Sequence, residues 1–177
     1  MLMEWNEHRE IEKFKKMGIY RILPNRDGKQ EYHYQVLKSA TKNIDFMGAT
    51  AHSFLHDFAN SVAAGEKASA LTKALENKVT VRILVTSKDL LVTEKHTKFE
   101  AAKIILDRLN KDYTNFHFGY SDQVPFYTLV RADNECIVGT IIPGVSSNIT
   151  SAIHASTDSP FLKCYLDHFE DKCKVIS

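Results

Sequence analysis

The sequence has little cysteine, no excess of either charge and no long hydrophobic run. Its three cysteines, Cys136, Cys164 and Cys173, form an odd set without a CxxC pair, which excludes a disulfide framework and predicts reduced thiols. The 23 basic and 22 acidic side chains give a formal charge of +1. The sequence has no excess of positive charge that could form a broad binding surface for a polyanion, so nucleic acid is not an expected partner. A local basic patch is not excluded by this balance.

The absence of a hydrophobic run excludes a transmembrane helix, and the first stretch, "MLMEWNEHREIEKFKKMG", is too charged for a signal peptide. We therefore expect a cytoplasmic protein without a membrane partner. A chain of 177 residues with 44% hydrophobic and 25% charged residues has the composition of a globular protein. This length favours one domain with a sizeable apolar core.

The sequence does contain an alternation of strand and helix patterns. Residues 3–17 place Trp5, Ile11 and Phe14 at helical spacing, and Gly18 is a helix stop. The segment "VTVRILVTS" is β-branched and almost continuously apolar, which is typical of a strand covered on both faces. Further strands are expected in "IYRILP", "NIDFMGAT", "NFHFGYS", twice in "PFYTLVRADNECIVGT" and around residues 152–155, with helices in "QEYHYQVLKSAT", "HSFLHDF", "ALTKALEN", "TKFEAAKIILDRLNKD" and "FLKCYLDHFEDKCKV". This order predicts an α/β fold, a mixed β-sheet flanked by helices on both faces, with an additional N-terminal helix.

Four stretches of the chain resemble one half of a phospholipase D-like protein. "LKSATKNIDFMGAT" and "LTKALENKVTVRILVTS" are similar to its first two helix–strand units, "FYTLVRADNECIVGT" to its motif hairpin, and "SPFLKCYLDHFEDKC" to its closing helix. The resemblance covers residues 19–177, which we take as the domain, with residues 1–18 as a separate N-terminal helix. Members with one motif per chain usually pair, so the resemblance also implies a homodimer, formed through either the motif face or the N-terminal helix.

The catalytic signature of that family is missing from this sequence. In the family, the histidine of an HxKxxxxD motif attacks phosphorus, while its lysine and the asparagine of a later Gly-Ser-x-Asn hold the phosphate oxygens. With Gly139 and Thr140 as the Gly-Ser pair, the histidine, lysine, aspartate and asparagine positions fall on Pro125, Tyr127, Ala132 and Ile142. A shift of one residue aligns Asp133 but gives the histidine and lysine positions to Phe126 and Thr128. The resemblance therefore implies a degenerate, non-catalytic site.

Non-catalytic members of this fold act as sensors, so the resemblance implies a ligand-sensing or regulatory binding module. Its ligand would be a small polar molecule, phosphorylated or nucleotide-like, bound without a cofactor or a metal where the missing active site would lie. Ligands of open α/β sheets bind beyond the carboxyl ends of the strands. The predicted ligand-binding residues are Thr50, His52, Ser87, Tyr127 and Thr140, with Arg131 as an anion contact.

Two other functions remain open. A phosphodiesterase or nuclease would need a histidine such as His52, His117 or His154 beside a second base or a metal. The third option is a protein–protein interaction module with no pocket in use.

Several local patterns have ordinary explanations beside functional ones. His52 and His56 share a helix face, as metal ligands would, but no third ligand is obvious, although Asp57 is adjacent. The "TSK" at 86–88 suits a phosphate or a helix cap equally. The HxK of His96 and Lys98 lies in a helical pattern, so we interpret it as chance. The loop hydroxyls and amide of Ser146, Ser147 and Asn148 can bind a ligand or form turns.

Overall fold

The computed structural model describes residues 11–24, 26–60, 65–142, 144–145 and 149–176. Its strands are β1 (Ile19–Leu23), β2 (Asn43–Gly48), β3 (Thr80–Thr86), β4 (Phe116–Ser121), β5 (Tyr127–Ala132), β6 (Glu135–Thr140) and β7 (Ala152–Ser156). Its helices are α2 (Arg26–Ser39), α3 (His52–Phe58), α4 (Ala70–Glu76), α5 (His96–Asp112) and α6 (Lys163–Lys172). Three short 3-10 turns, η1 (Lys88–Leu90), η2 (Thr93–Lys95) and η3 (Cys173–Val175), complete the order.

The seven strands form one mixed sheet in the order β1-β7-β6-β5-β2-β3-β4. β2, β3 and β4 are parallel neighbours, since helices connect them, whereas the β5–β6 hairpin, β7 and β1 pair antiparallel. β2 joins the two halves because it pairs with β3 on one side and with β5 on the other. The carboxyl ends of β2 and β3 therefore lie at the same edge as the start of β5.

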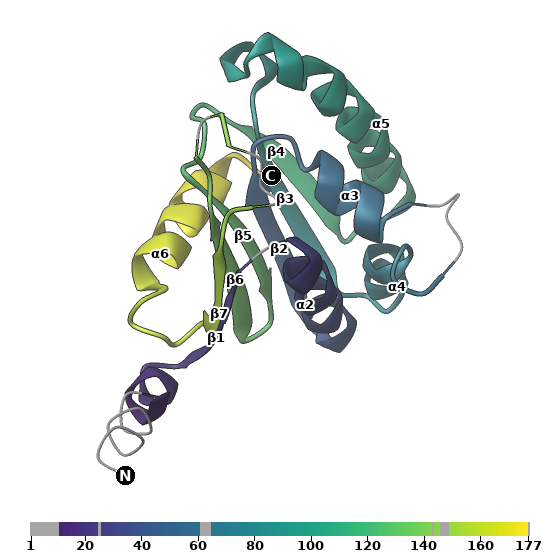
Figure 1. Ribbon diagram of the computed structural model, residues 1–177. Coiled ribbons are helices and arrows are strands. Elements are labelled where there is room, and N and C mark those ends of the chain that lie inside the picture. Colours follow the sequence, from purple (N-terminus) through teal and green to yellow (C-terminus); the bar gives the residue numbers. More distant parts are fainter. Residues whose placement is uncertain (1–10, 25, 61–64, 143, 146–148, 177) are drawn as a thin grey trace.

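Helices cover both faces of the sheet, as the sequence predicts (Figure 1). The helices α2, α3, α4 and α5 pack on one face over a large apolar core that includes Phe46, Leu55 and Ile83. Helix α6 and the η3 turn cover the other face over a smaller core that includes Leu129 and Phe169. The strand predicted to be covered on both faces, β3, is buried from Ile83 to Thr86. No helix in the described part of the chain combines the length and hydropathy that a bilayer crossing requires.

The helix of residues 11–16 precedes β1 and projects from the edge of the sheet (Figure 1). It ends at Gly18, whose φ of 74° lies in the left-handed region that glycine adopts without strain. This confirms the predicted helix stop. The earlier part of the predicted N-terminal helix, including Trp5, lies outside the described residues, as do Ser146, Ser147 and Asn148. The short strand predicted around residues 152–155 is confirmed as β7.

Candidate functional site

The edge at the carboxyl ends of β2 and β3 contains a small hollow. Its walls come from those strand ends, from the segment between β4 and β5, and from α6. The cavity volume is about 30 Å³, which is the space of about one water molecule. The lining residues are Met47, Gly48, Leu84, Val85, Ser121, Gln123, Val124, Pro125, Phe126 and His168.

Tyr127 is held between β6 and α6 beside this hollow. It lies directly opposite Thr140 in the β5–β6 register, so the two positions that the resemblance assigns to lysine and serine are neighbours. Its hydroxyl lies 3.0 Å from the backbone oxygen of Tyr165 and 2.7 Å from Nδ1 of His168. The ring packs edge-on against Tyr165, with centroids 4.9 Å apart. Burial raises the pKa of the Tyr127 hydroxyl above its ordinary value, so this group keeps its proton.

Arg131 belongs to a cluster of four charged side chains between the sheet and α6. Asp45 on β2 lies in register between Arg82 on β3 and Arg131 on β5. Its fully buried carboxylate accepts hydrogen bonds from Nε of Arg82 at 2.7 Å and from Nε of Arg131 at 2.6 Å. Glu170 on α6 accepts from the outer nitrogens of both arginines, at 3.0 Å and 2.6 Å. Both guanidinium groups also stand over the ring of Phe169, at 5.3 Å and 5.6 Å.

The cluster is electrically balanced, with two cations and two anions. The hydrogen bond from Arg82 to Asp45 raises the pKa of the Arg82 guanidinium above its ordinary value, and burial opposes this rise in part. Burial alone would lower the pKa of Arg131, but Asp45 and Glu170 raise it overall. The Arg131 guanidinium that the sequence suggested as an anion contact is thus already paired with two carboxylates.

The remaining predicted site residues lie around the same edge without lining the hollow. Thr50 and His52 follow β2, where Oγ1 of Thr50 accepts the backbone N–H of His52 at 3.4 Å. Ser87 follows β3 and donates to the backbone oxygen of Ser121 at 3.0 Å. Burial, then the neighbouring His56, lowers the pKa of His52. Thr140 is exposed at the end of β6. Arg131 is four positions along β5 from Tyr127, so it is not at this edge.

Asp133 lies in the turn of the β5–β6 hairpin and binds the first residue of β2 and the two residues before it. Its φ of 49° is left-handed, which aspartate tolerates better than most residues. One carboxylate oxygen accepts the N–H and the hydroxyl of Thr41, both at 2.8 Å, and the other accepts the N–H groups of Lys42 and Asn43 at 2.9 Å. Burial alone would raise the pKa of Asp133, but these hydrogen bonds lower it overall. Asp133 therefore stabilises a turn.

The histidines suggested for an alternative enzyme lie on separate elements. Nε2 of His154 on β7 is 2.8 Å from a carboxylate oxygen of Glu135 on β6. His117 lies on β4 opposite Arg82, and His52 opens α3, where its ring stacks on His56 with centroids 6.2 Å apart. Across the described residues, no three histidine, cysteine, aspartate or glutamate side chains gather as metal ligands would.

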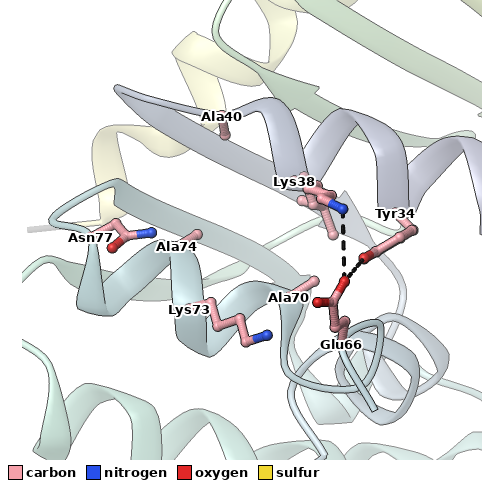
Figure 2. A pocket seen from close by; sticks show the side chains of 9 residues that line it. Tyr34, Lys38, Ala40, Glu66, Ala70, Lys73, Ala74 and Asn77 are labelled. Carbon is pink, nitrogen blue, oxygen red and sulfur yellow. Dashed lines mark hydrogen bonds and ion pairs between the residues drawn. The ribbon is translucent and has the colours of Figure 1, made fainter.

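A second, larger hollow lies between α2 and α4, with a cavity volume of about 160 Å³. Figure 2 shows Glu66 beside Tyr34 and Lys38, where its carboxylate accepts from the hydroxyl of Tyr34 at 3.1 Å and lies 3.7 Å from Nζ of Lys38. Ala70 and Ala74 belong to the α4 wall, and Lys73 stands on the same helix. The Glu66 carboxylate of this hollow therefore already has Tyr34 and Lys38 as partners. The sequence did not predict this hollow.

Four residues of the tyrosine and charge clusters were missing from the predicted site: Asp45, Arg82, Glu170 and His168. A sequence signal existed for Asp45 and Arg82, since each is a charge inside an otherwise apolar strand segment. Burial of such a side chain requires a partner of opposite charge. His168 carried no comparable signal, because its contact with Tyr127 is created by the docking of α6 and spans 41 positions of the chain.

Known structures with this chain topology define its fold. No protein-family model and no curated protein matches the sequence. The archaeal chromatin protein TrmBL2, whose structure shows a novel mode of DNA binding, matches with a TM-score of 0.58 and 13% identity over 99% of this chain and 63% of its own. The phospholipase D family member Nuc from Salmonella typhimurium matches with a TM-score of 0.54 and 14% identity over 84% of this chain and 88% of its own. NucT from Helicobacter pylori matches with a TM-score of 0.50 and 10% identity over 88% and 94%.

These similarities establish a phospholipase D-like α/β fold. The chain spans 63% of the length of TrmBL2 and 88% of the length of Nuc. At identities of 10–14%, the similarity extends to the fold alone.

Proposed function

We propose that this chain is a non-catalytic phospholipase D-like domain that acts as a ligand-sensing or regulatory binding module. The observation that carries this proposal is the state of Tyr127. In the register anchored on Gly139, it stands where the family's lysine would hold phosphate, and its hydroxyl is engaged by α6 at 3.0 Å and 2.7 Å. In the register shifted by one residue, Phe126 and Thr128 take the histidine and lysine positions of the motif, and neither side chain supplies an imidazole or an ammonium group.

The charge distribution also argues against phosphoryl transfer at this edge. A transferring phosphoryl group needs fixed cations or donors where its charge develops. The hollow has no lysine or arginine among its lining residues. Arg131 is paired with Asp45 and Glu170. A phosphorylated ligand would therefore rely on the rim formed by Thr50, His52 and Ser87, whose hydroxyl, imidazole and amide groups remain the predicted contacts.

A thermal-shift experiment tests the binding role. Adenosine monophosphate and glucose 6-phosphate serve as probes of the nucleotide-like and phosphorylated classes. A ligand at about 100 times its Kd stabilises the native state by about 2.7 kcal/mol. In a chain of this size that corresponds to a rise in Tm of about 5–10 °C. The double variant His52→Ala, Ser87→Ala should lose the shift, while Lys163→Ala, an exposed change on α6, should keep it.

A hydrolysis assay tests the absence of catalysis. Bis(p-nitrophenyl) phosphate incubated with the purified chain should release p-nitrophenol at the rate of buffer alone. Turnover that His154→Ala or His52→Ala abolishes would instead support the phosphodiesterase alternative. If there is neither turnover nor a thermal shift, and a protein partner binds, the interaction module would replace the sensor.

The homodimer belongs to the same proposal. Ile11 and Phe14 are exposed on the projecting helix, Met17 is exposed directly after it, and Tyr20 and Ile22 are exposed on the outer strand β1. Exposed large apolar side chains concentrated in one segment favour an interaction site. Light scattering coupled to gel filtration should give twice the chain mass. Phe14→Glu should yield monomers, whereas Lys16→Glu, a charge change on the opposite side of that helix, should not.

A further inference from the structure

The hydroxyl of Tyr127 has two partners but only one proton to donate. The backbone oxygen of Tyr165, at 3.0 Å, can only accept a hydrogen bond. Nδ1 of His168, at 2.7 Å, can donate or accept, depending on which ring nitrogen carries the proton. Both contacts are satisfied only when Tyr127 donates to Tyr165 and accepts from an N–H on His168 Nδ1. The opposite assignment would place the lone pairs of two oxygens against each other at 3.0 Å.

For a neutral ring, this count of protons also assigns the second nitrogen of His168. In the neutral ring with its proton on Nδ1, Nε2 bears a free lone pair and can accept a hydrogen bond. No hydrogen bond or ion pair of the described residues occupies Nε2. His168 lines the hollow between the ends of β2 and β3 and the start of β5. His168 therefore brings to the wall of the hollow a ring whose second nitrogen has no partner among the described residues.

The other lining residues limit what this nitrogen can receive. Met47, Leu84 and Val124 make the wall mainly apolar. Ser121 is buried, and its hydroxyl oxygen already accepts the N–H of Gln123 at 3.1 Å. No charged side chain lines the hollow, so neither an anion nor a cation would find a counter-charge there.

The volume of the hollow and the exposed ring of Phe126 limit the ligand further. A cavity of about 30 Å³ admits the donor atom of a ligand but not a whole ring. Phe126 lines the hollow, yet 85% of its surface is exposed, which leaves its ring free to pack against a second ring outside the hollow.

We propose that this hollow is a binding site for an uncharged aromatic group with one N–H or O–H donor, such as an indole or a phenol, which donates to Nε2 of His168 and packs on Phe126. The inference rests on the proposed binding role of the domain and specifies the group that enters the hollow, which lies beside the rim of Thr50, His52 and Ser87. Tyr127 is the positioning residue, because it sets which nitrogen of His168 faces the ligand.

The first test determines which ring nitrogen of His168 carries the proton, first in the unmodified chain and then in a variant. Long-range ¹H–¹⁵N correlation of the uniformly labelled full chain should show a proton on Nδ1 of His168 and none on Nε2. A proton on Nε2 would overturn the proposal, since the hollow would then contain a donor. Tyr127→Phe retains the ring that packs on Tyr165 but removes the hydroxyl, so the Nδ1 proton should no longer predominate.

The second test compares matched ligands by calorimetry and chemical-shift changes. Indole should bind about tenfold more tightly than 1-methylindole, which has the same ring without the donor. His168→Phe should remove this difference while leaving the weak binding of 1-methylindole, and Phe126→Ala should weaken both ligands. N-acetyltryptophanamide presents the same donor from a peptide, so its affinity relative to indole distinguishes a protein side chain from a free small molecule.

Equal binding of indole and 1-methylindole, or no binding of either at millimolar concentration, would overturn the proposed ligand class. Those outcomes leave the hydrolysis assay unaffected, whereas phosphodiester turnover would overturn the non-catalytic role without changing the indole result.

Discussion

At the scale of single residues, the chemistry of this molecule is concentrated where polar side chains are buried and paired. The Tyr127 hydroxyl donates a hydrogen bond to the backbone of α6, and the buried Asp45 carboxylate accepts hydrogen bonds from two arginines. On the proposed non-catalytic role, Tyr127 contributes packing and orientation at the motif edge, and Asp45 holds the charge cluster between the sheet and α6.

Asp133 gives a prediction with a defined pH dependence. Its folded-state pKa is lowered, so its contribution to stability is present above the unfolded pKa near 3.8 and is lost as the pH falls through the folded value. Asp133→Asn keeps the residue's size and its tolerance of a left-handed φ but removes the charged acceptor. Urea titration at pH 7 should show a loss of about 1–3 kcal/mol in unfolding free energy.

The difference between wild type and Asp133→Asn should shrink below about pH 4, since the wild-type carboxylate is then protonated in the unfolded chain and increasingly in the folded one. A difference that stays constant from pH 7 to pH 3 would contradict the assigned role of the charge. Asp158→Asn, an exposed aspartate, is the matched control.

Asp45 gives the largest expected effect. Asp45→Ala leaves Arg82 and Arg131 facing each other with half of their compensation removed, and breaking a buried ion pair from one side costs about 3–5 kcal/mol. Glu170→Ala removes the partner that is 47% exposed and should cost about 1 kcal/mol or less. Chemical unfolding of both variants measures the contrast, and equal losses would contradict the central position of Asp45.

At the scale of elements, the sequence predicted most of the fold. The strand at "VTVRILVTS" and the helix at "TKFEAAKIILDRLNKD" have strong periodic patterns, and the structure contains them as β3 and α5. The site was less predictable, because periodicity places a residue on a face but does not identify its partner. Arg131 was predicted to face an anion, and the carboxylates beside it come from β2 and from α6, 86 and 39 positions away.

Helix α6 provides a prediction at this scale, since it covers one face of the sheet with only η3 beside it among the described elements. Phe169 is fully buried, so Phe169→Ala should cost about 3–5 kcal/mol. Hydrogen exchange should show the amides of α6 losing protection more than those of α5, because α5 belongs to the other core. Uniform loss across both helices would contradict the separation of the two cores. Leu106→Ala in α5 is the converse variant.

At the scale of the whole molecule, residues 18–177 carry both cores and all seven strands. We expect a chain that begins at Gly18 to fold, because the described part of the N-terminal helix, residues 11–16, contributes to neither core, while the Gly18 oxygen accepts the N–H of Ser156 at 2.8 Å. Calorimetry should give a Tm within a few degrees of the monomeric full-length variant Phe14→Glu. A failure to fold would contradict the proposed division at residue 18.

The most direct test of the central claim is mass spectrometry of the intact protein after incubation with a phosphodiester substrate and quenching at alkaline pH, where phosphohistidine survives. The chain contains eight histidines, and none is assigned to attack phosphorus. The account predicts the unmodified mass at every time point. A covalent phosphoryl adduct on any histidine, formed and discharged during turnover, would contradict it.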